Sequence, residues 1–397
     1  VRDMGREIVR SESAQYPGGR SRLFIPEEVC DVLLAHNGSG NVEVLTLDRP
    51  GELDGVDLST EAFKKMKKLR VLTINELRIH GDFGLFPRAL KWLSWQKCPL
   101  KCIPSNFPAT NLVVLDMSWS DMEEFNLNLQ SCPRLKELNL SYCAQLTKTP
   151  NFKGAKSLET LLLKSCYCLM EIDQSICQLN SLQVLDITEC CIRELPIGVG
   201  DMQSLTSLCA NDTDLQQLPE FVEKLNNLRI LQVGNLELHS NEGRVIKSLS
   251  TSLSCLAIRN YGLSEAAFGA DIGSLSSLTS LDLSGNSFHY LPFDFSKLRL
   301  LKELHLNDCE NLQKLPSLSN LDNLQTLKLS NCKKLVDVTG LDDLLSIREI
   351  DMIDCNSLQN SPFNEDFFRA HALSSIKHPY QLLQIIAPCN EIPDWCR

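Results

Sequence analysis

A six-residue pattern, Leu-x-x-Leu-x-Leu or a close variant of it, recurs along most of this chain at a nearly constant spacing. Twelve copies begin at residues 90, 112, 135, 158, 182, 205, 228, 253, 278, 301, 324 and 347, so consecutive copies start 22 to 25 residues apart. Two looser copies begin at residues 42 and 69. A fixed period of this length indicates a stacked array, because one such unit cannot bury its own apolar face.

The alternation within each copy predicts a short β-strand whose leucines point into a core. Stacked copies would pair these strands in parallel, about 4.8 Å apart. A proline follows an apolar residue later in several repeats, which suits an irregular or 3-10 return path. Such a path is wider than a strand, so the stack should bend. We therefore predict an α/β leucine-rich-repeat solenoid, a horseshoe with strands on its concave face and mostly irregular or 3-10 segments on its convex side.

Three regions follow from where the period holds. Residues 1–40 precede the repeats and should be helical, with one clear helix from Glu27 to Leu34 and a boundary turn at residues 37–40. About 14 repeats occupy residues 42–360. Residues 361–397 break the period, and we expect Phe363, Phe367 and Phe368 to cover the exposed end of the core.

The chain has 17 cysteines, and seven of them recur at one position of the repeat. Eight residues after a repeat start, where this fold turns a side chain back into the stack, a small residue with a weak donor can face backbone carbonyls. We name these positions the ladder: Cys98, Cys143, Cys166, Cys190, Asn286, Cys309, Cys332 and Cys355. Reduced thiols in a core favour a reducing compartment over a disulfide framework. The cysteines also lack zinc-ligand spacing, so we predict no metal site.

Side chains between the strand leucines should point out from the concave face. They are polar, varied and mostly acidic, as expected of a surface that recognises a protein rather than a small apolar ligand. Exposed Trp92 and Trp119 are the best anchors, although each ring could instead lie against a neighbouring repeat or the preceding domain. The candidate partner-binding residues are Trp92, Trp119, Asp116, Tyr142, Lys164, Glu189, Asp212, Arg229, Arg259, His305, Lys328 and Arg348.

The charge balance argues against a nucleic-acid partner, because 50 acidic residues face 39 basic ones and the net charge is −11. We predict no membrane span, since no apolar run approaches about 18 residues. The chain begins with Val inside a motif, and we interpret it as a fragment. The seven histidines are scattered and no phosphate-binding or nucleophile-elbow motif occurs, so we predict no enzyme. A hydrolase triad assembled from distant residues is the alternative.

Several segments along the chain resemble plant intracellular immune receptors of the TIR–NB–LRR class. The resemblance covers the following segments: Val1-Arg-Asp-Met-Gly-Arg-Glu-Ile-Val9, Pro17-Gly-Gly-Arg-Ser-Arg-Leu23, Glu61-Ala-Phe-Lys-Lys-Met-Lys-Lys-Leu-Arg70, Leu90-Lys-Trp-Leu-Ser-Trp95, Pro99-Leu-Lys-Cys-Ile-Pro-Ser-Asn-Phe107 and Asn390-Glu-Ile-Pro-Asp-Trp395. Cys389 and Cys396 depart from the family, which has Gly and an aromatic residue there.

The resemblance implies that residues 1–40 end a winged-helix and nucleotide-binding module and that residues 361–397 begin a jelly-roll-like domain. It implies autoinhibition by the repeats, contact with the nucleotide-binding module, and recognition of a pathogen effector or a guarded host protein in the cytoplasm or nucleus. ADP or ATP would bind the parent protein, and NAD cleavage would belong to its TIR domain. Neither cofactor site is expected in this fragment.

Two other functions are consistent with the sequence. The first is an extracellular leucine-rich-repeat receptor, which would carry glycans on Asn37, Asn139 or Asn211. Each of these residues begins an Asn-x-Ser/Thr triplet. Asn139 would sit on a strand, and the Leu-x-Gly-x-Ile-Pro form typical of extracellular plant repeats is absent. A purely structural adaptor would share the fold and differ only in its partner.

Overall fold

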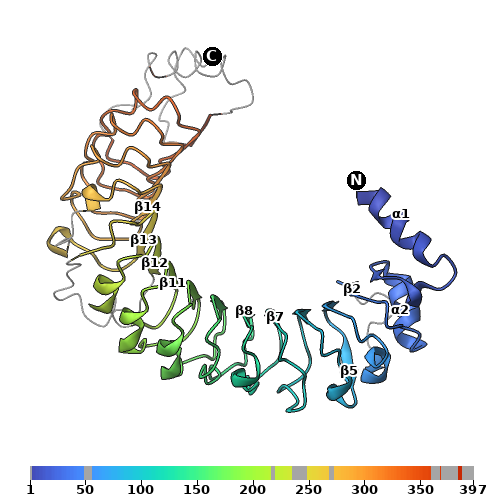
Figure 1. Cartoon of the computed structure of the whole chain (residues 1–397). Helices are drawn as coiled ribbons and strands as arrows, with labels where there is room; N and C mark the ends of the chain where they lie inside the picture. The colour runs from blue at the N-terminus through green and yellow to red at the C-terminus, as the bar shows by residue number, and fades with distance from the viewer. Residues whose placement is uncertain are drawn as a thin grey trace. The chain divides into compact units, whose positions relative to one another are not determined.

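The computed structural model describes residues 2–48, 56–215, 220–234, 248–267, 272–358, 367 and 383–386. The chain divides into two compact units, Val1–Leu205 and Thr206–Arg397, which we call the N-terminal and C-terminal units. Each unit contains one row of parallel strands, and Figure 1 shows the strands of each row lying side by side.

The N-terminal unit opens with two α-helices and continues as a strand stack. Its helices are α1 (Arg2–Glu12) and α2 (Pro26–Leu34). The parallel strands of its main sheet, in spatial order, are β1 (Arg22–Leu23), β2 (Val44–Leu47), β4 (Val71–Ile74), β6 (Trp92–Ser94), β7 (Val114–Asp116), β8 (Glu137–Asn139), β9 (Thr160–Leu162) and β10 (Val184–Asp186). A second, two-stranded sheet pairs β3 (Asp57–Ser59) with β5 (Arg78–His80).

The C-terminal unit continues the same design. Its parallel strands, in order, are β11 (Ser207–Asn211), β12 (Ile230–Gly234), β13 (Cys255–Arg259), β14 (Ser280–Asp282), β15 (Glu303–His305), β16 (Thr326–Lys328), β17 (Glu349–Asp351) and β18 (Gln384–Ile386). The last pair places Ile350 opposite Ile385, so the sheet extends beyond residue 360, where the sequence period stops.

The pattern leucines stack in register and form the core. In the N-terminal unit Leu72, Leu93 and Leu115 lie opposite one another in successive strands, and Leu138, Leu161 and Leu185 continue the row. All six are at most 1% exposed. The fold prediction is therefore confirmed: the chain is a leucine-rich-repeat solenoid built from parallel strands, with few helices.

The return paths are short 3-10 helices or irregular chain. In the N-terminal unit they lie on the side of the stack away from the main strands (Figure 1). They are η1 (Pro17–Gly19), η3 (Thr60–Phe63), η4 (Phe83–Leu85), η5 (Leu129–Ser131), η6 (Gln174–Gln178) and η7 (Ile197–Asp201), and the C-terminal unit adds η8 (Glu220–Lys224), η9 (Glu265–Ala267) and η10 (Ile272–Ser274).

The prediction for residues 1–40 was only partly right, because the segment between the two helices is not helical. Residues 17–19 form a 3-10 turn and residues 22–23 form β1, which pairs with β2 and adds a strand to the sheet. Arg20 explains the shape of this connection. Its guanidinium is buried and bonds to the Ser13 carbonyl at 2.8 Å and the Glu28 carboxylate at 2.6 Å, so it joins the two helices across the turn.

An aromatic cluster packs beside the leucine row near the start of the repeats. Trp95 is 1% exposed, and its indole N–H donates to the Leu77 carbonyl at 3.0 Å. The rings of Phe83 and Phe86 lie 6.2 Å and 6.4 Å from it, and Phe107 lies 5.4 Å from Phe86. This cluster fills the volume between the strands and the return path in this part of the N-terminal unit.

Phe367, one of the three phenylalanines expected to cap the array, is fully buried. Outside the described residues lie Phe363, Phe368, Cys389, Cys396 and the Asn390–Trp395 segment. Within the described part of the chain, no helix is long and apolar enough to cross a membrane.

Candidate functional site

One residue in most repeats adopts a left-handed backbone conformation just after the strand. It lies seven residues after the repeat start, next to the ladder position, and its φ is between 44° and 71°. We call this set the left-handed row: Glu76, Lys97, Trp119, Tyr142, Ser165 and Glu189 in the N-terminal unit, and Asp212, Asn260, Gly285, Asp308, Asn331 and Asp354 in the C-terminal unit. The turn lets the backbone N–H of Tyr142, for example, donate to the Lys164 carbonyl of the next repeat at 2.6 Å.

The six members of the left-handed row in the N-terminal unit are unusual for that conformation, because none of them is Asn, Asp or Gly. Asn, Asp and Gly tolerate positive φ, whereas it costs other residues about 1–2 kcal/mol. Trp119 (φ 64°) and Tyr142 (φ 63°) adopt it nevertheless. Their rings stack with centroids 3.9 Å apart and planes 3° from parallel, and Trp119 remains 53% exposed. Because positive φ recurs along the row, the feature that distinguishes these two residues is the stacked ring pair, and we call it the Trp119–Tyr142 platform.

Polar groups on neighbouring repeats flank the platform. On one side Lys97 pairs with Glu76 at 2.6 Å. Asp116, on strand β7, accepts hydrogen bonds from the Gln96 amide at 2.9 Å and the Ser118 N–H at 3.0 Å. The platform is therefore an aromatic surface framed by charged groups that are themselves held in place.

Glu189 lies two repeats beyond Tyr142 in the left-handed row. Its carboxylate accepts hydrogen bonds from the Ser165 and Tyr167 hydroxyls at 2.5 Å and 3.1 Å. The Ser165 bond, with help from Tyr167 and the nearby charge of Lys164, lowers the pKa of Glu189 below its usual range. Glu189 therefore stays charged, and it holds the side chain of Tyr167 against the left-handed row.

Trp92 is not part of this group. It lies on β6 in register with Val71 and Val114, and it is 43% exposed. Within the described residues, no ring contact joins it to another aromatic side chain. The structure thus leaves Trp92 as a separate exposed ring on the strand face, the layer of side chains that point away from the leucine core.

The strand face of the C-terminal unit has a charged cluster at its centre. Asp282 is 5% exposed; Arg259 donates its Nε–H to it at 2.6 Å, and the His305 Nδ1 lies 3.5 Å from the same carboxylate oxygen. Burial alone would raise the pKa of Asp282, but hydrogen bonds from His305 and Ser284 and the charge of Arg259 outweigh burial and lower that pKa to about 2. In the next strand Lys328 pairs with Glu349 at 3.1 Å.

The lowered pKa makes the C-terminal unit sensitive to acid through Asp282. A folded-state pKa of about 2, against an ordinary aspartate pKa of 3.8, means that this group stabilises the fold above pH ~4 and that the contribution is lost as the pH falls through ~2. The difference corresponds to about 2 kcal/mol. We expect Asp282→Asn to lower stability at pH 7 by about that amount and to flatten the stability profile between pH 4 and 2, as measured by urea unfolding.

Exposed Asp322 in the same unit provides the control. The Asp322→Asn variant should keep the wild-type profile between pH 4 and 2. An Asp282→Asn profile as steep as that of the wild type would contradict the assigned role of the Arg259–Asp282–His305 cluster.

The ladder side chains are all buried, and most of them make one repeated contact. The thiol donates to a carbonyl at the end of the preceding strand, as in Cys166 to Leu140 at 3.2 Å, Cys190 to Leu163 at 3.1 Å and Cys355 to Leu329 at 3.0 Å. Burial raises the pKa of Cys98, Cys143 and Cys309 to about 12. These thiols are therefore protonated donors at neutral pH and poor nucleophiles.

Asn286 and Ser120 occupy the ladder position without sulfur. Ser120 donates to the Met117 carbonyl at 2.6 Å. The Asn286 amide donates to Ile258 and Leu283 carbonyls at 2.7 Å and 2.8 Å and accepts from the N–H groups of Tyr261 and Leu263. The ladder is thus a column of buried side chains, most of which donate a hydrogen bond to the previous repeat.

The described cysteines are free thiols, ladder members included. Among the described residues, no group of three or more His, Cys, Asp or Glu side chains could hold a metal ion.

Known proteins with similar sequences indicate the family of this chain. Disease resistance protein RPS6 of Arabidopsis thaliana is 33% identical over 338 residues, which cover 82% of this chain and 29% of that protein. TMV resistance protein N of Nicotiana glutinosa is 26% identical and covers 80% of this chain and 36% of its own length. The chain is a homologue of plant disease resistance proteins. This confirms the resemblance to TIR–NB–LRR receptors, although the chain spans only about a third of the length of these relatives.

Solved structures agree on the fold. The leucine-rich-repeat protein LIC12759 of Leptospira interrogans matches with a TM-score of 0.56 and 21% identity, over 91% of this chain and 98% of that one. The functional domain of InlJ from Listeria monocytogenes, described as including a cysteine ladder, matches with a TM-score of 0.56 and 17% identity, over 75% of this chain and 63% of that one. At these identities the likeness shows the fold alone. No protein-family model matches the chain.

The structure brings some of the predicted partner-binding residues of this resistance-protein homologue together and leaves others apart. Trp119, Tyr142 and Glu189 all lie in the left-handed row. Arg259 and His305 both contact the Asp282 carboxylate. Asp212 is exposed on the left-handed row of the C-terminal unit, Arg229 and Arg348 are exposed just before strands β12 and β17, and Lys164 is half-buried. Asp282 was missing from the predicted set, although its place between two strand leucines is the signal that could have found it.

Proposed function

We propose that this chain is the recognition region of a plant disease resistance protein and that it binds a pathogen effector or a host protein that an effector modifies. The names of its relatives describe resistance, including resistance to a virus in the protein from Nicotiana glutinosa. In this role the repeats bind and restrain rather than catalyse. Signalling would follow from the nucleotide-binding and TIR modules of the parent protein. The nucleotide-binding module would bind ADP or ATP, and the parent protein would act in the cytoplasm.

The Trp119–Tyr142 platform is the observation that carries the proposal. A stacked pair in which Trp119 is 53% exposed and Tyr142 is half-buried presents a rigid aromatic area at small entropic cost, which is the profile of an interface anchor. Truncation of such an anchor commonly costs about 2 kcal/mol or more, or about 30-fold in affinity. Each ring packs on the other, which orders both rings before any partner arrives.

The test uses the full-length receptor that contains this chain. The wild-type receptor is introduced into susceptible plants, which are challenged with a panel of pathogen isolates to find those that trigger defence only when the receptor is present. We expect a receptor with Trp119→Ala and Tyr142→Ala to lose the response to these isolates while accumulating to wild-type levels.

The matched control is Ile197→Ala, which removes an exposed apolar side chain from η7 on the return-path side of the same unit. This variant should respond as the wild type does. The proposal is wrong if no isolate produces a receptor-dependent response. The platform has no part in recognition if the double variant responds normally.

A further inference from the structure

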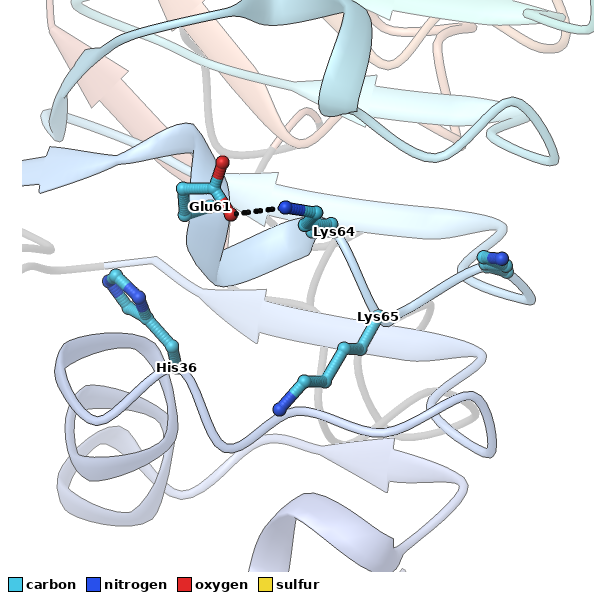
Figure 2. A pocket seen from close by; sticks show the side chains of 5 residues that line it. His36, Glu61, Lys64 and Lys65 are labelled. Atoms are coloured by element: carbon cyan, nitrogen blue, oxygen red, sulfur yellow. Dashed lines mark hydrogen bonds and ion pairs between the residues drawn. The ribbon is translucent and has the colours of Figure 1, made fainter.

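An open cleft of about 550 Å³ lies near the start of the repeats, away from the Trp119–Tyr142 platform. It is formed where the chain leaves α2 and where it turns after η3, and it is lined by His36, Glu61, Lys64, Lys65 and Lys67. Figure 2 shows His36 on one side of this space and Glu61 and Lys64 on the other, with the Lys65 side chain extending away from the Glu61–Lys64 pair.

The lining is basic in a chain that is acidic overall. Three ammonium groups and one imidazole face a single carboxylate, whereas the whole chain has a net charge of −11. Glu61 is paired with Lys64 at 3.1 Å. Within the described part of the chain, Lys65 and Lys67 have no carboxylate within ion-pair distance. Their charges therefore add to a local positive field that an anion would neutralise.

The backbone that presents these lysines is held firmly. Phe63, Met66 and Leu69 are buried and alternate with the lysines, which forces the lysine side chains outward. The backbone N–H groups of Lys64, Met66 and Leu69 donate to the carbonyls of Glu61, Phe63 and Met66.

The segment that follows α2 forms the other wall of the cleft and packs against the turn after η3. A Cβ at Gly38 would come within 2.0 Å of the end of the Met66 side chain, so the two segments are in close contact here. The left-handed turn at His36 (φ 52°) and the bond from the Asn37 N–H to the Val32 carbonyl end α2 at the cleft. Both walls are therefore built before a ligand binds, so binding would not need to order the backbone.

We propose that this cleft binds a small polyanion with two or more phosphate groups, either a free polyphosphate or a phosphorylated lipid headgroup. Lysine ammonium groups bind phosphate as point charges, and His36 adds a ring N–H donor. A volume of about 550 Å³ exceeds what a single phosphate needs. The net charge of −11 on the whole chain disfavours an extended nucleic acid and favours a compact ligand. This site is independent of the proposed recognition function.

The experiment measures binding of sodium tripolyphosphate to the whole chain by isothermal titration calorimetry at low ionic strength. We expect saturable binding that weakens as salt is added. The Lys65→Gln/Lys67→Gln variant should bind about tenfold more weakly or worse, because each ammonium–phosphate contact is a charge-assisted hydrogen bond. The matched control, Lys302→Gln/Lys314→Gln, removes the same charge from exposed positions of the C-terminal unit and should bind as the wild type does.

Vesicles distinguish the two sources of phosphate. In a sedimentation assay, phosphatidylcholine vesicles containing a phosphatidylinositol bisphosphate are compared with vesicles carrying the same charge as phosphatidylserine. Selective binding to the phosphoinositide vesicles assigns a headgroup, and binding to tripolyphosphate alone assigns a free polyphosphate. The proposal is overturned if neither probe binds, or if the cleft variant and the control variant lose binding equally.

Discussion

Replacing Asn286 with Ala is expected to lower the free energy of unfolding of the C-terminal unit by about 3–5 kcal/mol. The Asn286 side chain is 2% exposed and makes four hydrogen bonds of 2.7 to 3.1 Å with backbone groups of Ile258, Leu283, Tyr261 and Leu263. Alanine would leave these four buried groups without their side-chain partner, and each unsatisfied buried polar group costs about 1–3 kcal/mol before the structure relaxes. Urea denaturation monitored by circular dichroism measures the loss.

A cysteine at the same position is the informative comparison. Asn286→Cys restores the donor that other repeats use, such as Cys309, whose thiol reaches the Leu283 carbonyl at 3.4 Å. A thiol is a weak acceptor and cannot replace the amide oxygen for both N–H groups. We therefore expect the cysteine variant to lose about half as much stability as the alanine variant. Equal stability of all three proteins would show that the ladder hydrogen bonds do not support the fold.

The repeat before Asn286 explains why this position is not a cysteine. That repeat begins at residue 253 and is 25 residues long, and its turn contains both Asn260 and Gly262 with positive φ. The longer turn directs the N–H groups of Tyr261 and Leu263 to one point, and the Asn286 carbonyl oxygen accepts from both. Among residues that fit the ladder, only an amide donates and accepts at once with this capacity.

Trp95→Ala is expected to destabilise the N-terminal unit by about 3–5 kcal/mol, the range for removing a large buried aromatic side chain. Trp95 is 1% exposed, and its removal would leave a cavity beside Phe83 and Phe86 and an unpaired carbonyl at Leu77. Hydrogen exchange of the amides in β4 and β6 should speed up more than exchange in β9 and β10, because repeats transmit stability mainly to their neighbours.

Trp95→Phe separates the two causes. Phenylalanine keeps most of the packing and loses the indole N–H, so we expect a loss of about 1–2 kcal/mol. A Trp95→Ala variant less than about 1 kcal/mol below the wild type would mean that the cluster collapses into the cavity and that the ring carries little of the packing energy.

Much of the fold could be predicted because the spacing of the repeats determines the register of the strands. The spacing of 22 to 25 residues predicts which leucines meet, and Leu115, Leu138 and Leu161 do lie opposite one another. The ladder positions follow from the same count, since a fixed distance from the strand places a side chain in the same turn of each repeat. Local pattern and burial agree at these positions, so the sequence alone specifies them.

Strands outside the period could not be predicted in this way. Strand β1 has two residues and no repeat pattern, and its pairing with β2 depends on the buried Arg20–Glu28 contact that folds the helices around it. Strand β18 joins β17 after a stretch without the period. Both strands form because the edge of a parallel sheet offers unpaired backbone groups to any segment that reaches it.

The repeat follows from the amino-acid pattern alone, and with it the parallel strands, the leucine core and the buried column of ladder side chains. Which surface residues act together depends on the folded chain. Trp119 and Tyr142 are 23 residues apart, and nothing in the sequence shows that both take positive φ and stack their rings. The same is true of Arg259, Asp282 and His305, which meet at one carboxylate. Buried positions are dictated by the period because apolar area must be removed from water, whereas exposed side chains meet according to backbone angles and rotamers that the period does not constrain.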